Sequence, residues 1–316
     1  MSKLLIGVSS CLLGNRVRYD GNHRLDCYIT ETLGNFFQYI HFCPEVECGL
    51  GVPRETMQLV GTPASAHLLT TKTRIDHTER LKRWTEKTLN SLASENLCGY
   101  IFKTKSPSCA MVDAKVFSTE NSSVERGPGL FAAAFTKRFP LIPTIDEGRL
   151  HNEQLRENFI EKVCVLTRWH HYLKNDPNCL NLIRFHEHHK YLIMSHSPKK
   201  QQTLGNMLAD CGQIFSSQLQ DEYIKQLMET LSLTATVKKH TNVLQHIAGY
   251  LKKQLSSDQK KELQEIIENY QRGLLPLTAP LTLLKHYVRL FNEPFLSQQI
   301  YLNAHPAELM LRNELL

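Results

Sequence analysis

The first half of the sequence alternates between short apolar runs and amphipathic stretches, and this alternation restricts the fold more than any other feature. We expect strands at residues 4–8, 37–42, 98–103 and 141–145. Residues 78–96 have the spacing of a helix, and a second helix is predicted to follow the Gly127-Pro128-Gly129 turn. Strands that alternate with helices pair in parallel through right-handed crossovers. The sequence therefore predicts an α/β domain with a mainly parallel, Rossmann-like sheet.

The pattern becomes almost wholly helical after residue 152, with prolines marking the breaks. In residues 237–255, for example, Val237, Leu244, Ile247 and Leu251 fall on one face of a helix. A chain of 316 residues is also longer than a usual single domain. We therefore predict an α/β domain over residues 1–155 and an all-α domain over residues 156–316.

Composition narrows the class of protein further. Hydrophobic residues make up 41% of the chain and charged residues 22%, as in ordinary globular proteins, and no apolar run reaches the length of a membrane span. The nine cysteines are odd in number and include no C-x-x-C pair, which favours a reducing cytoplasm over a disulfide framework. The net charge of +6 permits a nucleic-acid partner without requiring one. We expect a cytoplasmic protein with no membrane or disulfide partner; a monomer fits, and the oligomeric state stays open.

Three cysteines stand directly after predicted strands: Cys11, Cys43 and Cys109. Ligands of open parallel sheets bind beyond the carboxyl ends of the strands, so these thiols are expected to converge there. Three thiolates would hold an iron–sulfur cluster and leave one iron open to a substrate. Cys48 is the alternative fourth ligand, which would close the cluster and favour electron transfer, although the flanking residues indicate a turn that leads away. The remaining cysteines are interpreted as small buried apolar residues: Cys27, Cys98, Cys164, Cys179 and Cys211.

Polar groups with catalytic chemistry surround these cysteines. Glu45 places a carboxylate two residues from Cys43, where an ionisable group beside a metal centre is a natural general acid or base. The hydroxyls of Ser106 and Ser108 precede Cys109 and are suited to bond a substrate atom or a cluster sulfur. The candidate substrate-binding residues are Arg18, Tyr19, Asp20, Arg54, Ser108, Gly127 and Gly129.

Taken together, these segments resemble the thiouracil desulfidase (TudS-like) family. The matching motifs are S-S-C-L-L-G-x-x-V-R-Y-D-G at 9–21, F-C-P-E-V at 42–46, G-V-P-R at 51–54, F-K-T-K-S-P-S-C at 102–109 and the turn at 127–131. The resemblance implies a 4Fe–4S cluster on Cys11, Cys43 and Cys109, whose open iron takes the thiocarbonyl sulfur of a thiolated uracil. It also implies that Glu45 transfers a proton or activates water and that Ser106 assists. Ala110 departs from the glycine expected in many relatives.

The second half carries a histidine-rich segment, but not a recognisable metal site. Residues 186–190 read H-E-H-H-K and miss the zincin pattern H-E-x-x-H at its last position. Residues 182–198, with 147–150 and 301–306, resemble the YbgA-type helical domain that is fused to desulfidase domains. Such fused members resemble the desulfidases of 4-thiouridine in transfer RNA (RudS-like). The helical half is then expected to present the RNA, with these candidate contacts: Arg184, His186, His189, Lys190, Lys238 and Lys252.

The leading hypothesis is an iron–sulfur-dependent, non-redox desulfidase that converts thiolated uracil, most directly 4-thiouridine in tRNA, to uridine and hydrosulfide. One alternative is an iron–sulfur enzyme that thiolates tRNA. That reaction needs an activated oxygen, usually through ATP, and the sequence has no Walker-type phosphate loop. Another alternative is a non-enzymatic iron–sulfur sensor or RNA-binding protein. The choice among tRNA, nucleotide and free base, and between 2-thio and 4-thio groups, stays open at this point.

Overall fold

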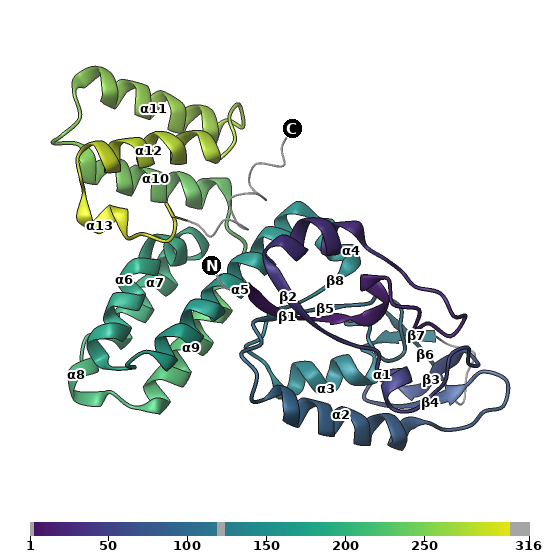
Figure 1. Ribbon diagram of the computed structural model, residues 1–316. Coiled ribbons are helices and arrows are strands. Elements are labelled where there is room, and N and C mark those ends of the chain that lie inside the picture. The colour runs from purple at the N-terminus through teal and green to yellow at the C-terminus, as the bar shows by residue number, and fades with distance from the viewer. Residues whose placement is uncertain (1–2, 119–123, 304–316) are drawn as a thin grey trace. The chain divides into compact units, whose positions relative to one another are not determined.

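The computed structural model describes residues 3–118 and 124–303, and the chain divides into two compact units, Met1–Thr167 and Arg168–Leu316 (Figure 1). Both this division and the predicted boundary after residue 155 lie within helix α5 (Glu153–Lys174). Among the helices of the described ranges, none has the length and apolar character needed to cross a membrane. Each unit is considered separately below.

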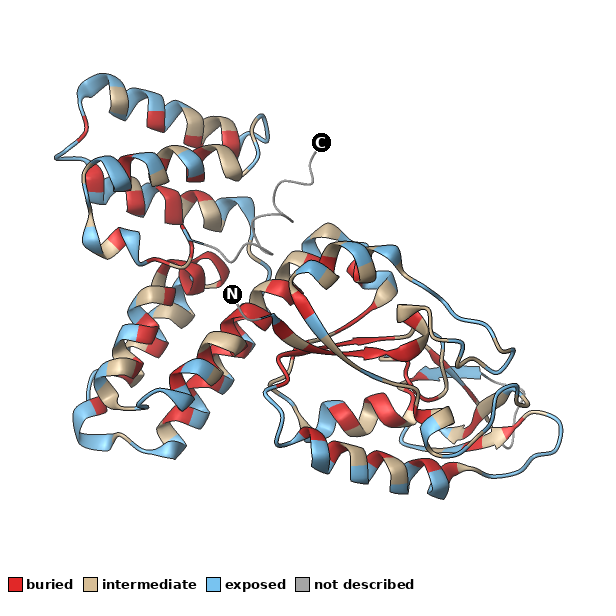
Figure 2. Ribbon diagram, in the orientation of Figure 1, coloured by how far each residue is buried: buried red, intermediate tan, exposed pale blue. Residues whose placement is uncertain are grey.

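A four-stranded parallel sheet, sheet A, forms the centre of the first unit. Its strand order is β2 (Phe37–Phe42), β1 (Leu4–Ser9), β5 (Gly99–Phe102) and β8 (Thr144–Asp146). The central strand β1 is apolar almost throughout because both of its faces are covered, and Ile6 and Val8 are fully buried. Figure 2 shows sheet A as a largely buried layer. The predicted α/β domain with a parallel sheet is confirmed.

Helices cover this sheet and supply its core. Figure 1 shows α2 (Thr78–Leu92) and α3 (Leu130–Arg138) on the same side of sheet A. Beneath them lies a cluster of buried aromatic side chains from β5 and α3: Tyr100, Phe102, Phe131 and Phe135. Aromatic side chains bury a large apolar area each, so this cluster anchors the loops at the sheet's carboxyl edge. Short helical segments follow the strands of sheet A: η1 (Ser10–Leu13), η2 (Tyr28–Thr32), η3 (Leu33–Asn35), α1 (Pro44–Glu47) and α4 (Glu147–Leu150).

A second four-stranded sheet, sheet B, was not predicted from the sequence. Its order is β4 (Ser65–Thr70), β3 (Met57–Thr62), β6 (Ala114–Phe117) and β7 (Val124–Gly127). The outer pairs are antiparallel and the central β3–β6 pair is parallel. Its strands are short and only partly buried, and three of the four residues of β7 are exposed. Such strands lack the continuous apolar run that reveals a strand of a buried parallel sheet.

The second unit is all-α, as predicted. Its helices are α6 (Cys179–His196), α7 (Pro198–Met207), α8 (Cys211–Ile214), α9 (Ser217–Leu231), α10 (Val237–Leu251), α11 (Ser257–Gln271), α12 (Thr278–Leu290) and α13 (Pro294–Ser297). Polar side chains accept a backbone N–H at the start of five of them: Asn178, Ser197, Ser216, Thr236 and Ser256. These N-caps satisfy N–H groups that have no partner inside the helix, which explains where the helices begin. Leu244, Ile247 and Leu251 are fully buried as predicted, whereas Val237 is exposed at the first turn of α10.

Candidate metal centre

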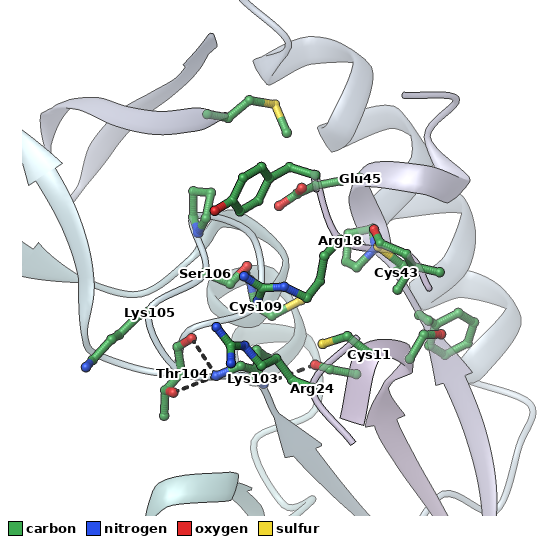
Figure 3. A pocket seen from close by; sticks show the side chains of 18 of the residues that line it. Cys11, Arg18, Arg24, Cys43, Glu45, Lys103, Thr104, Lys105, Ser106 and Cys109 are labelled. Atoms are coloured by element: carbon green, nitrogen blue, oxygen red, sulfur yellow. Dashed lines mark hydrogen bonds between the residues drawn. The ribbon is translucent and has the colours of Figure 1, made fainter. Parts of the chain in front are cut away.

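The carboxyl edge of sheet A brings three thiols to one cavity. Cys11 lies in η1 directly after β1, Cys43 follows β2 as the N-cap of α1, and Cys109 lies in the loop between β5 and β6. All three line the same cavity of about 570 Å³. Figure 3 shows them reaching this space from three separate segments. The arrangement follows from parallel pairing, because the strands then end at one edge.

The loop before Cys109 is fixed by its own serine and by helix α3. The Ser106 hydroxyl accepts hydrogen bonds from the backbone N–H groups of Ser108 (3.2 Å) and Cys109 (3.1 Å). The first N–H groups of α3 donate to the carbonyls of Pro107 and Ser108. Gly129, the N-cap of α3, approaches Ser108 so closely that any Cβ would collide with its backbone. The loop that carries the thiol is therefore held on both sides.

Burial and neighbouring charges raise the pKa values of all three thiols. Burial, followed by the charge of Cys43, raises the pKa of Cys11 to about 11, while Lys103 and Arg18 act in the opposite direction. Burial also raises the pKa of Cys43, and that of Cys109 lies well above its usual range because of burial and the charges of Cys43 and Cys11. The thiols are thus neutral by themselves at ordinary pH. Binding of a metal group would release their protons, as thiolate ligation requires.

The donor set fits an iron–sulfur cluster. Soft thiolates are the ligands that clusters take, and the three sulfurs come from a rigid sheet edge with open space before them. In the described part of the chain, no three Cys, His, Asp or Glu side chains gather closely enough to hold a single ion. A cluster does not need that geometry, because each of its thiolates binds a different iron.

Cys48 and the other cysteines lie elsewhere. The Cys48 thiol donates to the Glu45 carbonyl at 3.3 Å and is absent from the described cavity wall. Cys98, Cys164 and Cys211 are buried, as interpreted from the sequence. Cys179 is only half-buried. Cys27 is exposed, so the interpretation of Cys27 as a buried residue is wrong: it stands just before η2 with its side chain at the surface.

Glu45 is clamped at both carboxylate oxygens. Arg54 donates from Nε (3.0 Å) and Nη2 (2.5 Å) to Oε2, and the Ser108 hydroxyl donates to Oε1 at 2.9 Å. Arg54 also binds the carbonyls of Val17 (3.0 Å) and Gly51 (3.2 Å), which ties three loops together. A bidentate Arg–carboxylate pair fixes orientation as well as charge. Glu45 therefore faces the cavity in one defined position.

The residues predicted to bind substrate lie partly in the cavity wall and partly outside it. Arg18, Tyr19 and Arg54 line the cavity, but the side-chain bonds of Arg54 go to Glu45 and to two carbonyls. Ser108 is fully buried and its hydroxyl is used by Glu45, which corrects its assignment to substrate binding. Three further candidates lie outside the described cavity wall: Asp20, Gly127 and Gly129. Of these, Gly129 is needed for the packing of α3.

A group of cations in the cavity wall was missed in the sequence. Arg24, Lys103 and Lys105 join Arg18 there. Lys103 pairs with Glu147, which also accepts from the backbone (2.8 Å) and hydroxyl (2.6 Å) of Thr104. Within the described residues, the side chains of Arg24 and Lys105 have no partner, and Figure 3 shows Lys105 extending away from the cysteines. The K-T-K stretch within the motif at 102–109 was the available signal.

The residues predicted to contact RNA divide into two groups. Arg184, Lys238 and Lys252 are exposed, and Lys190 is half-buried. His186 and His189 are buried: Nδ1 of His186 meets the Tyr223 hydroxyl at 3.2 Å, and Nδ1 of His189 meets the Phe185 carbonyl at 2.7 Å. Burial lowers the pKa of His186 to about 4 and that of His189 to about 3. Both are neutral core residues, which corrects their assignment as RNA contacts.

Comparison with known proteins matches each part of the chain separately. A family model described as 2-thiouracil desulfurase matches residues 6–147, and one described as a protein of unknown function (DUF1722) matches residues 190–306.

YbgA of Escherichia coli (strain K12) is 33% identical over 133 residues, which are 42% of this chain and 79% of YbgA. YbbK of Bacillus subtilis (strain 168) is 32% identical over 110 residues, 33% of this chain and 72% of YbbK. The solved structure of TudS, a 4Fe–4S-dependent thiouracil desulfidase, is 28% identical, with 48% of this chain and 94% of TudS covered and a TM-score of 0.39.

Fold, site and family model together define an enzyme of the desulfidase class. The helical part of the chain belongs to the YbgA family, and residues 6–147 match the family model of 2-thiouracil desulfurases. The resemblance recognised from the motifs is thereby confirmed.

Proposed function

We propose that this enzyme removes the sulfur of a thiolated uracil by hydrolysis, at a 4Fe–4S cluster held by Cys11, Cys43 and Cys109. The preferred substrate is 4-thiouridine in tRNA. The reaction consumes one water, replaces the thiocarbonyl sulfur by oxygen and releases hydrosulfide, with no net transfer of electrons. The observation that carries the proposal is the convergence of three thiols on a cavity that also contains a clamped carboxylate.

When bound, the cluster supplies an iron without a protein ligand, a Lewis acid able to bind the substrate sulfur. Three cysteines in the wall and Cys48 outside it support this open position. Lys103 and Arg18 favour the thiolate form of Cys11 and so assist ligation.

Glu45 is the proton-transfer residue in this proposal. Its carboxylate faces the cavity, where it accepts a proton from the attacking water and returns it to the departing sulfur. Arg54 and Ser108 hold both oxygens and so position them before the substrate arrives. Ser106 contributes by holding the backbone of Cys109, and its place in the cavity wall also allows contact with the substrate.

Positively charged side chains in the cavity wall and on the helical unit support a nucleotide within RNA as the substrate. Arg24 and Lys105 place cations in the wall of the cavity, where a phosphate attached to the uracil nucleoside can bind. In the helical unit, Lys238 lies in the first turn of α10 and Lys252 follows the helix, and both are exposed. Such cations contribute affinity for a phosphate backbone that weakens as salt increases.

The test is an anaerobic comparison of substrates. Protein reconstituted with iron and sulfide is incubated with tRNA that contains 4-thiouridine, with 4-thiouridine monophosphate and with free thiouracil, and hydrosulfide is measured. We expect release from tRNA at the highest kcat/KM. If none of the three releases hydrosulfide, the proposed reaction is wrong; if only free thiouracil reacts, the proposed substrate is wrong.

A further inference from the structure

Tyr100 carries a buried hydroxyl that the proposed reaction does not use. Its side chain is fully buried, and among the described residues its oxygen has no hydrogen-bond partner. An unpaired buried hydroxyl destabilises the folded state, and most buried polar groups in native proteins have a hydrogen-bond partner. The position of this hydroxyl therefore calls for an acceptor that only the functional state supplies.

The packing of its ring places Tyr100 in the same buried cluster as Cys109. Tyr100 pairs with Gly7 of the neighbouring strand, and its ring lies across that glycine, where any Cβ would overlap it. The ring stacks on Phe102 with centroids 4.1 Å apart. Cys109 belongs to the same buried cluster. The phenol and the Cys109 thiol thus share one apolar compartment behind the cavity wall.

The charges that shift the pKa of Tyr100 come from residues of the same centre. Burial raises the pKa of Tyr100 well above its usual range, and the next largest cause is the negative charge of Cys109. Glu47, Cys43 and Cys11 follow. All three proposed ligands therefore act on this one phenol, and Cys109 acts most strongly.

Cys109 already has one hydroxyl partner. A hydrogen bond from Ser9 lowers the pKa of Cys109, although burial dominates. The Ser9 oxygen accepts the backbone N–H of Lys103 at 3.1 Å, so its own proton is left for the sulfur. By contrast, the Cys43 thiol points to the Val17 carbonyl at 3.6 Å. Among the described residues, Cys109 is thus the proposed ligand whose sulfur has a hydroxyl partner.

We propose that Tyr100 is a positioning residue of the cluster, whose hydroxyl donates a hydrogen bond to the sulfur of Cys109 when that sulfur is an iron-bound thiolate. A neutral thiol is a weak acceptor, whereas a thiolate is a strong one. The inference rests on the proposed function, because it requires a cluster at Cys109. Hydrogen bonds to cluster sulfurs raise the reduction potential and stabilise the cluster.

The test is Tyr100→Phe, which deletes the hydroxyl and keeps the ring. In the iron-loaded protein we expect a more negative reduction potential and roughly three- to tenfold faster loss of iron to a chelator, the range of one net hydrogen bond. In the iron-free protein the variant should unfold at the same or a higher denaturant concentration than the wild type, because it removes an unpaired group. A residue with a merely structural role would not give these opposite signs.

Tyr223→Phe is the matched control, since its hydroxyl already pairs with His186. This variant should lose stability with and without iron and leave the potential unchanged. If Tyr100→Phe binds a cluster with unchanged potential and unchanged iron loss, the inference is wrong while the proposed function stands. If the wild type assembles no cluster, both are wrong.

A second measurement covers the case in which Tyr100→Phe does not fold. Incorporation of 3-fluorotyrosine makes every phenol a stronger donor, and a Tyr19→Phe background removes the tyrosine of the cavity wall. The potential of the cluster should then move to more positive values. An unchanged potential would contradict the hydrogen bond.

Discussion

The two units use the same kinds of side chain in opposite ways. In the α/β unit, Cys11, Cys43 and Cys109 stand at strand ends and line a cavity. In the helical unit, Cys211 and His189 are enclosed in the core, where burial raises the pKa of the thiol to about 12 and lowers that of the imidazole to about 3. Residue type alone therefore does not mark a site. The position at the carboxyl edge of a parallel sheet distinguishes the thiols of the candidate metal centre from those in the helical core.

Among substitutions of carboxylate side chains, we expect the largest loss of activity at Glu45. Glu45→Gln keeps the shape of the side chain but removes its capacity to take a proton. We expect kcat to fall by roughly 10²- to 10⁴-fold, as for loss of a general base, with iron content unchanged. Glu86→Gln, which changes an exposed carboxylate on α2 outside the described cavity wall, is the control and should keep full activity. More than a tenth of the wild-type kcat in Glu45→Gln would remove Glu45 from the mechanism.

The helical unit should lose stability in acid because its histidines are buried and neutral. The folded pKa values of His186 (about 4) and His189 (about 3) lie below the ordinary 6.5 of an unfolded chain. The unfolded state therefore binds more protons between these values, so stability present above about pH 6.5 is lost as the pH falls. At about pH 5 each histidine should reduce the free energy of unfolding by about 2 kcal/mol.

Tryptophan fluorescence can follow this loss in the helical unit alone. The chain has two tryptophans, Trp84 in the first unit and Trp169 in the second, so a Trp84→Phe variant reports only on Trp169. Urea unfolding at about pH 7.5 and about pH 5 measures the difference. His189→Leu should flatten the pH dependence, and the exposed His246→Gln should not. Equal stability at both pH values would show that these histidines are protonated in the folded state.

The smallest effect is expected from the surface lysines of the helical unit. Lys238→Glu with Lys252→Glu should lower kcat/KM for thiolated tRNA several-fold and weaken its salt dependence, with thiouridine monophosphate unaffected. Lys260→Glu with Lys261→Glu makes the same change of charge on α11 and serves as the control. Equal losses in both double variants would indicate a general charge effect and not a defined RNA surface.

The sequence revealed the elements whose patterns are strong. Strands β1 and β5 are almost wholly apolar runs, β2 is rich in aromatic residues, and α2 has a regular apolar face. Sheet B escaped prediction because its strands mix exposed and buried positions over short lengths. The Gly61-Thr62-Pro63-Ala64 turn between β3 and β4 was the one local signal of a hairpin there.

The sequence was enough to predict where the three thiols lie, but not which hydrogen bonds surround them. Parallel pairing alone is enough to place Cys11, Cys43 and Cys109 at one edge. The separate tasks of Ser106 and Ser108 depend on which way neighbouring side chains of one loop point, and no sequence pattern encodes that. The Arg54–Glu45 pair joins two loops and likewise has no periodicity. His186 and His189 were misassigned because a charged helix face and a buried polar pair look alike in sequence.

The central claim is that three cysteines, and not four, hold the cluster and leave one position for the substrate. The most direct measurement is iron content and hydrosulfide release for Cys11→Ser, Cys43→Ser, Cys109→Ser and Cys48→Ser after the same anaerobic reconstitution. The account predicts that each of the first three variants loses its cluster and its activity, while Cys48→Ser keeps both. Loss of the cluster in Cys48→Ser, or an active cluster in any of the other three variants, would contradict it.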